Sequence, residues 1–301
     1  MRLFPLNNII CLIFLIFTLI FTPGCKENEV AVKAQSVRLA LSDISSDKWE
    51  ALARKKIFFA HQSVGNNIMD GIRDVLAEHP EIHLSVSAYR TWDKADILDT
   101  MSPEDFDAPV FAHEQNIGRN QFPLSKIDDF AQILDSGIGN KVDIAFIKFC
   151  FVDFEANTDY EKILNQYKEK MNELKSSYPE TTFIHFTVPL LRKDTSGVMA
   201  SAKKFIKSLA GKEKDTFFDN SNNVVRNKYN TMLLEIYEGK EPVFDLAGLQ
   251  STYPDGSQEM FTFKGSRYFA LVPDYTDDGG HLNQYGRKMV AEQLLIFLAN
   301  I

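Results

Sequence analysis

The stretch from Ile57 to Asn67, which reads IFFAHQSVGNN, decides the fold that we expect for this chain. Its apolar beginning completes a run over 56–60 that predicts a buried strand. The following segment, 67–79, repeats apolar residues along one helical stripe and predicts a helix. A strand that turns directly into a helix is typical of α/β folds. Ser63 therefore lies near the carboxyl end of a strand, where open α/β sheets build their functional sites.

The same alternation continues along the chain. Further strands are predicted at 82–88, 142–150, 182–188 and 242–246, and further helices at 163–178, 222–237 and 285–299. The run 142–150 is apolar almost throughout, which is typical of a central parallel strand covered on both faces. The segment 82–88 alternates apolar and polar residues, which favours a strand nearer the edge. We therefore predict an α/β fold, a mostly parallel sheet with helices on both faces. Residues 247–277 combine aromatic and turn-forming residues and predict an inserted loop or hairpin near the site.

The N-terminus has the pattern of a targeting segment. Arg2 precedes an apolar run, 9–21, which is shorter than the roughly 20 residues that a membrane span needs. The run ends at Gly24-Cys25, which resembles the cleavage and acylation site of bacterial lipoproteins. We expect a signal peptide over 1–24, a lipid on Cys25, a polar tether over 25–50 and one domain over 51–301. The alternative is an ordinary secretory signal, and both place the mature chain in the cell envelope or outside the cell.

Composition narrows the function. The net charge of −8 and a pI near 5.3 argue against nucleic acid as a partner and leave the lipid as the only expected membrane contact. If Cys11 leaves with the signal and Cys25 carries lipid, Cys150 is alone and no internal disulfide can form. The sequence contains no metal-ligand motif and no glycine-rich phosphate loop, so we expect neither a metal nor a cofactor.

Two distant segments together supply the groups of a serine nucleophile. Ser63 follows the first strand, and Asp278-Gly279-Gly280-His281 precedes the last predicted helix. A serine needs a base, and the base needs a partner that fixes its tautomer. An aspartate three residues before a histidine can reach the imidazole within one turn, and the two glycines permit that turn. Structural alternatives are that Ser63 only caps a helix and that Asp278 only caps a turn.

This layout resembles the SGNH/GDSL hydrolase superfamily over about residues 55–300. The resemblance implies a three-layer, flavodoxin-like fold in which Ser63, His281 and Asp278 form the catalytic triad. It also implies an oxyanion hole built from the N–H groups of Ser63 and of a loop glycine, best matched by Gly118. The family's third oxyanion donor is an asparagine, but Val152 occupies that place. Asn120, Arg119 or Asn66 could replace the missing donor.

The resemblance implies a secreted or lipid-anchored serine esterase that cleaves small acyl esters of the acetyl type, on a small molecule or a polysaccharide. An O-acetyltransferase of envelope polysaccharide is one alternative, because the same machinery transfers the acyl group when water is excluded. A catalytically silent domain that binds a glycan or a partner is another. An α/β-hydrolase is disfavoured, because His61 breaks the Gly-x-Ser-x-Gly elbow.

Three other residue groups admit separate interpretations. Cys150 ends a buried strand, and we expect an inert thiol there rather than a nucleophile. Asp153 and Glu155 could form the carboxylate pair of a glycosidase, although carboxylates are common. Lys148 places a charge inside the most apolar strand and must find a partner if it is buried.

Overall fold

The computed structural model describes residues 38–90, 100–193 and 219–301. The strands are β1 (Lys56–Ala60), β2 (Val86–Tyr89), β3 (Val110–Glu114), β4 (Ile144–Ile147), β5 (Thr182–Phe186), β6 (Val243–Phe244), β7 (Met260–Phe263) and β8 (Ser266–Phe269). The α-helices are α1 (Ser46–Ala53), α2 (Val64–Glu78), α3 (Pro123–Asp135), α4 (Tyr160–Ser177), α6 (Asn220–Tyr237), α7 (Leu246–Ser251) and α8 (Gln284–Leu298). Short 3-10 turns cover Leu41–Asp43, Pro103–Phe106, Ile138–Asn140, Phe151–Asp153 and Pro273–Tyr275.

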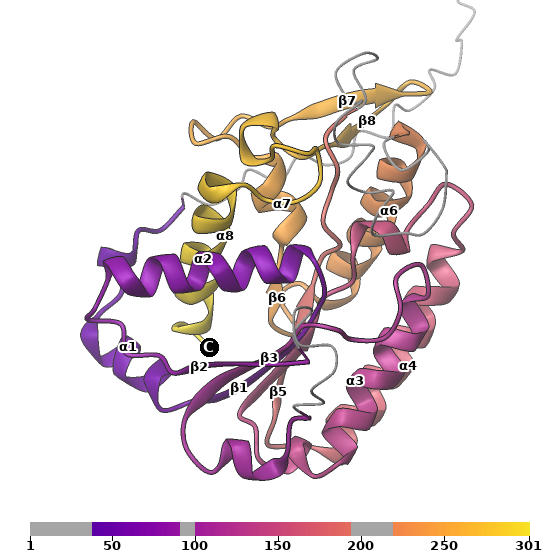
Figure 1. Cartoon of the computed structure of the whole chain (residues 1–301). Coiled ribbons are helices and arrows are strands. Elements are labelled where there is room, and N and C mark those ends of the chain that lie inside the picture. The colour runs from indigo at the N-terminus through magenta and orange to yellow at the C-terminus, as the bar shows by residue number, and fades with distance from the viewer. Residues whose placement is uncertain (1–37, 91–99, 194–218) are drawn as a thin grey trace, which may run out of the picture.

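Six strands form one sheet in the order β2-β3-β1-β4-β5-β6, and all five neighbouring pairs are parallel (Figure 1). The predicted α/β class is therefore confirmed. The chain builds β2 and β3 on one side of β1 and then β4, β5 and β6 on the other. Ligands in such sheets bind at the carboxyl ends of the strands where the order reverses. In this protein those strands are β3, β1 and β4.

Successive residues of β1 face opposite layers, which explains why its apolar run is continuous. Ile57 and Phe59 belong to the core beneath α1, α2 and α8, whereas Phe58 and Ala60 belong to the core beneath α3, α4 and α6. Phe59 stacks on Phe146 of β4 with ring centroids 4.6 Å apart. Burial of both faces makes β1 and β4 the rigid centre from which the site loops extend.

The N-terminal part of the described chain packs on the domain, although we expected a tether as far as residue 50. Arg38 donates hydrogen bonds to the carbonyl oxygens of Leu249 and Thr252. The Trp49 side chain, on α1, is buried in the core. Residues 38–50 thus belong to the folded domain, because Ile44 and Trp49 join the core formed by α2 and α8. The predicted signal peptide and the lipidation site at Cys25 lie outside the described residues.

The segment that we expected to be an insertion contains α7 and the antiparallel hairpin β7–β8. Phe261 and Tyr268 pack on α6 through Val224. Lys193 also reaches this hairpin, with Nζ 2.7 Å from Glu259 Oε1. The hairpin is therefore fastened to the body of the domain on at least two sides.

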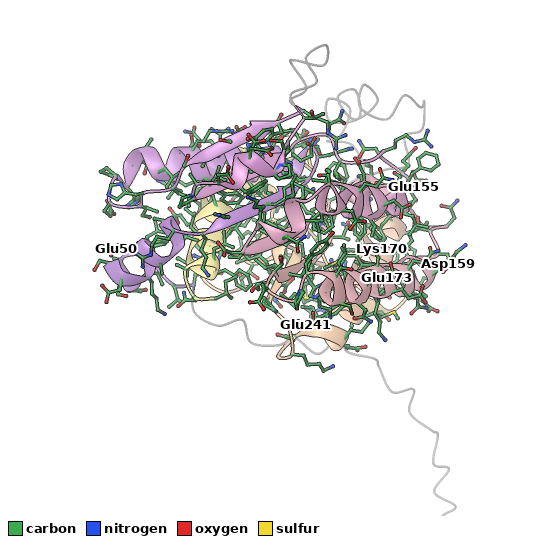
Figure 2. All side chains as sticks on the ribbon, turned by 90° about the horizontal axis from the view of Figure 1, so that it is seen from below. Glu50, Glu155, Asp159, Lys170, Glu173 and Glu241 are labelled. Carbon is green, nitrogen blue, oxygen red and sulfur yellow. The ribbon has the colours of Figure 1, made fainter. Side chains whose placement is uncertain are left out.

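The outer face of α4 is charged. Asp159 caps the helix by accepting a hydrogen bond from the Lys162 N–H, and Lys170 pairs with Glu173 one turn apart (Figure 2). The inner face of α4 carries Ile163, Leu164, Tyr167, Met171 and Leu174, as the sequence pattern predicted. No helix among the described residues is both long and apolar enough to span a membrane.

Candidate active site

Ser63 occupies a strained position between β1 and α2. It is the N-cap of α2, and its backbone has φ 32° and ψ −89°, a region that residues with a side chain rarely adopt. Such strain costs on the order of 1–3 kcal/mol and persists only where the surroundings enforce it. Among the described residues none accepts a hydrogen bond from the Ser63 N–H. The strained turn therefore leaves a backbone donor available beside the serine hydroxyl, at the positive end of a helix.

The neighbours of Ser63 hold this turn tightly. The His61 N–H donates to the Glu114 carbonyl oxygen of β3 at 2.9 Å. A Cβ on Gly65 would lie 2.3 Å from the His61 ring, so only glycine allows α2 to begin so close to the strand. Gln62 donates through Nε2 to the carbonyl oxygens of Ile117 and Gly118, at 2.6 and 3.1 Å. The loop after β3 is thus fastened to the residue that precedes Ser63.

Asp278 and His281 form a hydrogen-bonded pair within one turn. Asp278 Oδ2 lies 2.7 Å from His281 Nδ1, while Oδ1 accepts from the N–H groups of Gly280 and His281 at 2.9 and 2.8 Å. Burial opposes ionisation of Asp278, but the His281 hydrogen bond and charge, with these N–H groups, lower its pKa. An ionised carboxylate only accepts, so Nδ1 of His281 carries a proton and Nε2 is left as the basic nitrogen.

Contacts between α2 and the Asp278–His281 turn bring the two segments together. Asn67, one helical turn after Ser63, accepts a hydrogen bond from the Leu282 N–H at 3.1 Å. Gly71 lies so close to α8 that a Cβ there would be 2.3 Å from the Arg287 carbonyl oxygen. The described contacts include no direct hydrogen bond between the Ser63 hydroxyl and His281. In unliganded enzymes this catalytic hydrogen bond is often long and tightens when substrate binds.

Phe151, on the turn after β4, contacts the His281 imidazole. Its ring meets that of His281 edge to face, with centroids 5.4 Å apart. The Phe151 carbonyl oxygen in turn accepts from Nε of the buried Arg226 at 2.9 Å. Burial lowers the pKa of Arg226 to about 9, which the nearby carboxylates of Glu155 and Asp153 oppose. Phe151 and Arg226 were not predicted, because neither has a local sequence signal.

The contacts of Gly118 do not agree with the oxyanion role that the family resemblance implies. Its φ is 52°, as a loop glycine allows, but its N–H donates to Asp129 Oδ2 at 2.9 Å. Asp129 is also paired with Arg90 at 3.0 Å, which holds the carboxylate in place. The Gly118 N–H is therefore already engaged, and we do not assign it to the oxyanion hole.

The other candidate donors differ from one another. Arg119 stacks over the Phe122 ring at 4.4 Å, and this places its guanidinium on the outside of the loop. Asn66 has a buried Oδ1 without a hydrogen-bond partner. Val152, which occupies the place of the family's asparagine, is buried, and its side chain has no hydrogen-bond donor. Asn120 accepts a hydrogen bond from Lys126 Nζ at 3.0 Å, which makes it part of a larger network.

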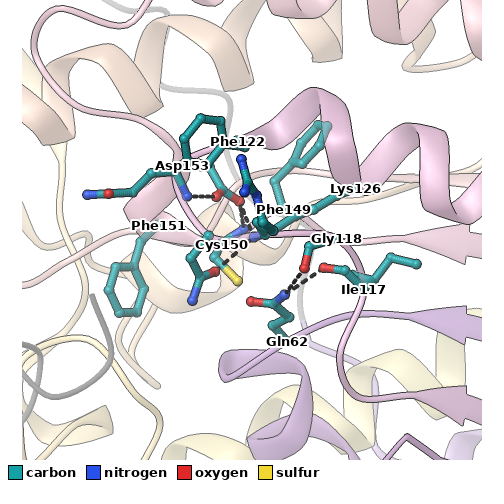
Figure 3. A network of polar contacts seen from close by, with 12 residues as sticks. Gln62, Ile117, Gly118, Phe122, Lys126, Phe149, Cys150, Phe151 and Asp153 are labelled. Carbon is teal, nitrogen blue, oxygen red and sulfur yellow. Dashed lines mark hydrogen bonds and ion pairs between the residues drawn. The ribbon is translucent and has the colours of Figure 1, made fainter. Parts of the chain in front are cut away.

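That network surrounds a buried ion pair that the sequence did not reveal (Figure 3). Lys126 Nζ lies 2.6 Å from Asp153 Oδ2, and neither side chain is exposed. Asp153 also accepts from the N–H groups of Cys150 and Gln121, at 2.7 and 2.9 Å. Burial alone would lower the pKa of Lys126, but the Asp153 carboxylate more than offsets it and raises that pKa. Asp153 is thus committed to a structural pair, which disfavours it as one of the two carboxylates of the glycosidase alternative.

Two histidines and a lysine lie buried beneath the same loops. His61 Nε2 lies 2.9 Å from His113 Nδ1, and His113 Nε2 lies 2.9 Å from the Arg73 guanidinium. Lys148 has the partner that its burial requires, because its Nζ donates to the Phe149 carbonyl oxygen at 3.1 Å and lies 3.7 Å from Cys150 Sγ. Burial lowers the pKa of Lys148. No group of three or more potential metal ligands occurs among the described residues.

No family model and no curated protein matches the sequence. The chain is similar to solved structures at low identity. A candidate platelet activating factor from Streptococcus pneumonia has a TM-score of 0.46 and 13% identity, with 84% of this chain and 90% of that chain covered. The periplasmic domain of a lipopolysaccharide acetyltransferase from Salmonella ser. Paratyphi A has a TM-score of 0.40 and 8% identity, covering 85% and 88%. A candidate GDSL-like lipase from Parabacteroides merdae has a TM-score of 0.34 and 9% identity, covering 81% and 96%. These similarities are too distant to assign an activity.

Proposed function

We propose that this chain is a serine esterase of the SGNH/GDSL type that cleaves small acyl esters through Ser63, His281 and Asp278. The observation that carries the proposal is the Asp278–His281 pair, tied by Asn67 to the helix that begins at the strained Ser63. A turn that only capped a helix would not need a strained serine at one end of the contact and an oriented imidazole at the other. The substrate is an acetyl-type ester, on a small molecule or a polysaccharide of the cell envelope.

The chemistry follows from the direction of the hydrogen bonds. The Ser63 hydroxyl attacks the ester carbonyl and gives its proton to Nε2 of His281, since Nδ1 is held by Asp278. The tetrahedral oxyanion accepts a hydrogen bond from the Ser63 N–H. His281 then returns the proton to the leaving alcohol, and a water molecule activated by the same imidazole releases the acyl group from Ser63. Asp278 stays ionised throughout and stabilises the imidazolium.

Secretion and lipid anchoring belong to the same proposal. The apolar run 9–21 and the following Gly24-Cys25 support export and acylation. An envelope location would expose the site to acetylated polysaccharide, which is the substrate class that we favour.

The test is hydrolysis of p-nitrophenyl acetate by the mature domain, together with labelling by a fluorophosphonate. We expect Ser63→Ala to lose both turnover and labelling while it keeps the thermal unfolding midpoint of a folded domain. Ser176→Ala, which removes an exposed hydroxyl on α4, should behave as the wild type in both assays. Turnover that survives in Ser63→Ala, or a folded wild type that neither hydrolyses the ester nor reacts with the probe, would refute a serine esterase.

A further inference from the structure

The oxyanion hole described so far has too few donors. Family enzymes supply a loop glycine N–H and an asparagine in addition to the serine N–H, but here Asp129 engages Gly118 and Val152 has no donor. Loss of one such donor lowers kcat by about 10²–10³. A working esterase therefore needs a substitute close to Ser63.

In the loop after β3, a hydrogen bond fixes the orientation of the Asn120 side chain. Lys126 Nζ donates to Asn120 Oδ1 at 3.0 Å and cannot accept, so it selects the amide oxygen of Asn120 and turns the amide nitrogen away. Among the described residues none accepts from Asn120 Nδ2. The NH₂ group of Asn120 thus remains a donor for a ligand.

Two sets of contacts tie the loop that carries Asn120 to the residue before Ser63 and to the turn after β4. Gln62, the residue before Ser63, donates hydrogen bonds to the carbonyl oxygens of Ile117 and Gly118, which lie three and two residues before Asn120 (Figure 3). From the other side, the fully buried Lys126 is anchored by Asp153 at 2.6 Å. Asp153 lies on the turn after β4, directly beside Val152, where the family carries its asparagine.

We propose that Asn120 is the missing oxyanion donor and that Lys126 is the positioning residue that aims its amide nitrogen at the reacting carbonyl. This inference rests on the proposed function. Asp153 supports the arrangement from the turn after β4, where Val152 stands at the place of the family's asparagine. The side-chain oxyanion donor would then come from the loop after β3, whereas in the family it comes from the loop after β4. The charge of Lys126 would polarise the Asn120 amide.

The first test measures kcat and KM for p-nitrophenyl acetate in two variants of Asn120. Asn120→Ala removes the donor, and Asn120→Asp keeps an oxygen for Lys126 but replaces the NH₂ group by a second oxygen. Both should lower kcat by about 10²–10³ with KM changed by less than about twofold. Asn116→Ala is the matched control, because Asn116 is an exposed asparagine of the same loop, and its kcat should equal that of the wild type.

The second test separates positioning from mere support of the fold. Lys126→Met should lower kcat strongly in the wild type but have almost no further effect in the Asn120→Ala background, since the two residues act through one hydrogen bond. A purely structural role would lower kcat by the same factor in both backgrounds. Lys126→Arg preserves the charge and the donors, and should retain more activity than Lys126→Met. It also serves if the unpaired Asp153 prevents the methionine variant from folding.

The results that would overturn the role of Asn120 differ from those that would overturn the proposed esterase function. Full activity in Asn120→Ala, with none in Ser63→Ala, would overturn the Asn120 assignment and leave the esterase intact. Equal losses from Lys126→Met with and without Asn120 would overturn the positioning role. A wild type without a reactive serine would instead remove the proposed function, and the inference with it.

Discussion

At the scale of single residues, the backbone of Ser63 is the clearest departure from relaxed geometry. A φ of 32° is unusual for a residue with a Cβ, and the neighbouring contacts through His61, Gln62 and Gly65 enforce it. Strain of this kind concentrates at functional sites, because it presents a side chain and a free N–H that relaxed backbone would hide. Ser63 would thus be kept at this position for chemistry and at the expense of stability.

Two substitutions of Ser63 separate the hydroxyl from the strain. Ser63→Gly and Ser63→Ala both remove the nucleophile, but only glycine adopts positive φ without a Cβ clash. We expect the glycine variant to be more stable than the alanine variant by about 1 kcal/mol, which is the relief of strain less the greater backbone entropy of unfolded glycine. Urea unfolding of the two variants measures this difference. A glycine variant no more stable than the alanine variant would show that the turn is not strained.

The site residues could be predicted from the sequence to different degrees. Ser63, Asp278 and His281 could be proposed from the sequence because a strand end and a four-residue turn are local patterns. Lys126 was missed because its meaning depends on Asp153, 27 positions along the chain, and on burial that a lone lysine does not announce. The hydrogen bond from the Gly118 N–H to Asp129 likewise depends on the tertiary structure, and no local sequence pattern predicts it. The sequence thus predicted candidate residues that lie in local patterns, but it did not predict the distant side chains that orient them.

At the scale of secondary-structure elements, the contact between α2 and α8 sets the distance between Ser63 and His281, the proposed nucleophile and base. Gly71 allows the backbones of the two helices to approach closely, and Arg287 of α8 pairs with Asp74 of α2 at 2.8 Å. The Asn67–Leu282 hydrogen bond lies at the end of the same interface that faces the site. Because each catalytic segment adjoins one of these helices, their packing determines whether Ser63 and His281 can meet.

Widening this interface should damage stability and activity together. In Gly71→Ala the new Cβ would lie 2.3 Å from the Arg287 carbonyl oxygen, so the helices must separate. We expect a loss of about 1–3 kcal/mol in the free energy of unfolding, despite the better helix propensity of alanine, and a lower kcat at temperatures where the variant is folded. Ala77→Val adds more volume on the exposed side of α2 and should cost no more than about 0.5 kcal/mol. Unchanged kcat in a destabilised Gly71→Ala would contradict the role of this interface.

The elements differed in how well the sequence predicted them. The predicted strands 56–60 and 142–150 correspond to β1 and to the central β4, and the predicted strand 82–88 corresponds to β2, at the sheet edge. β3 and α3 were not predicted. Three of the five residues of β3 are apolar, but it ends in His113 and Glu114, whose burial is made tolerable by Arg73 and Arg90. Periodicity therefore identified the apolar elements and missed a strand whose polar residues find hydrogen-bond and ion-pair partners on distant parts of the chain.

At the scale of the whole molecule, the buried histidines make stability depend on pH. Burial lowers the pKa of His61 well below its usual range, with further lowering from His113, Lys148 and Arg73. Burial, with Arg73, lowers the pKa of His113 to about 3. In the unfolded chain both imidazoles titrate near 6.5. Between these values the unfolded chain binds more protons than the folded protein, so acid favours unfolding.

The free energy of unfolding should therefore fall as the pH drops below about 6.5, by up to about 1.4 kcal/mol per pH unit for each of these histidines. Urea unfolding between pH 7 and 5 isolates the effect, because carboxyl groups of the unfolded chain titrate mostly at lower pH. We expect His113→Gln to flatten the slope relative to the wild type and His83→Gln, which changes an exposed histidine, to leave it unaltered. A wild type equally stable at pH 7 and pH 5 would contradict the neutral buried pair.

The acid and the base of this site occupy one short turn, 278–281, and their mutual geometry is closed by hydrogen bonds within that turn. For these two groups, folding of the rest of the chain then has one long-range relation to establish, between this preassembled turn and Ser63. A site whose three groups come from three separate loops must fix several such relations at once. The relation between this turn and Ser63 therefore depends on the spacing of α2 and α8, and not on the sequence of the more distant helices.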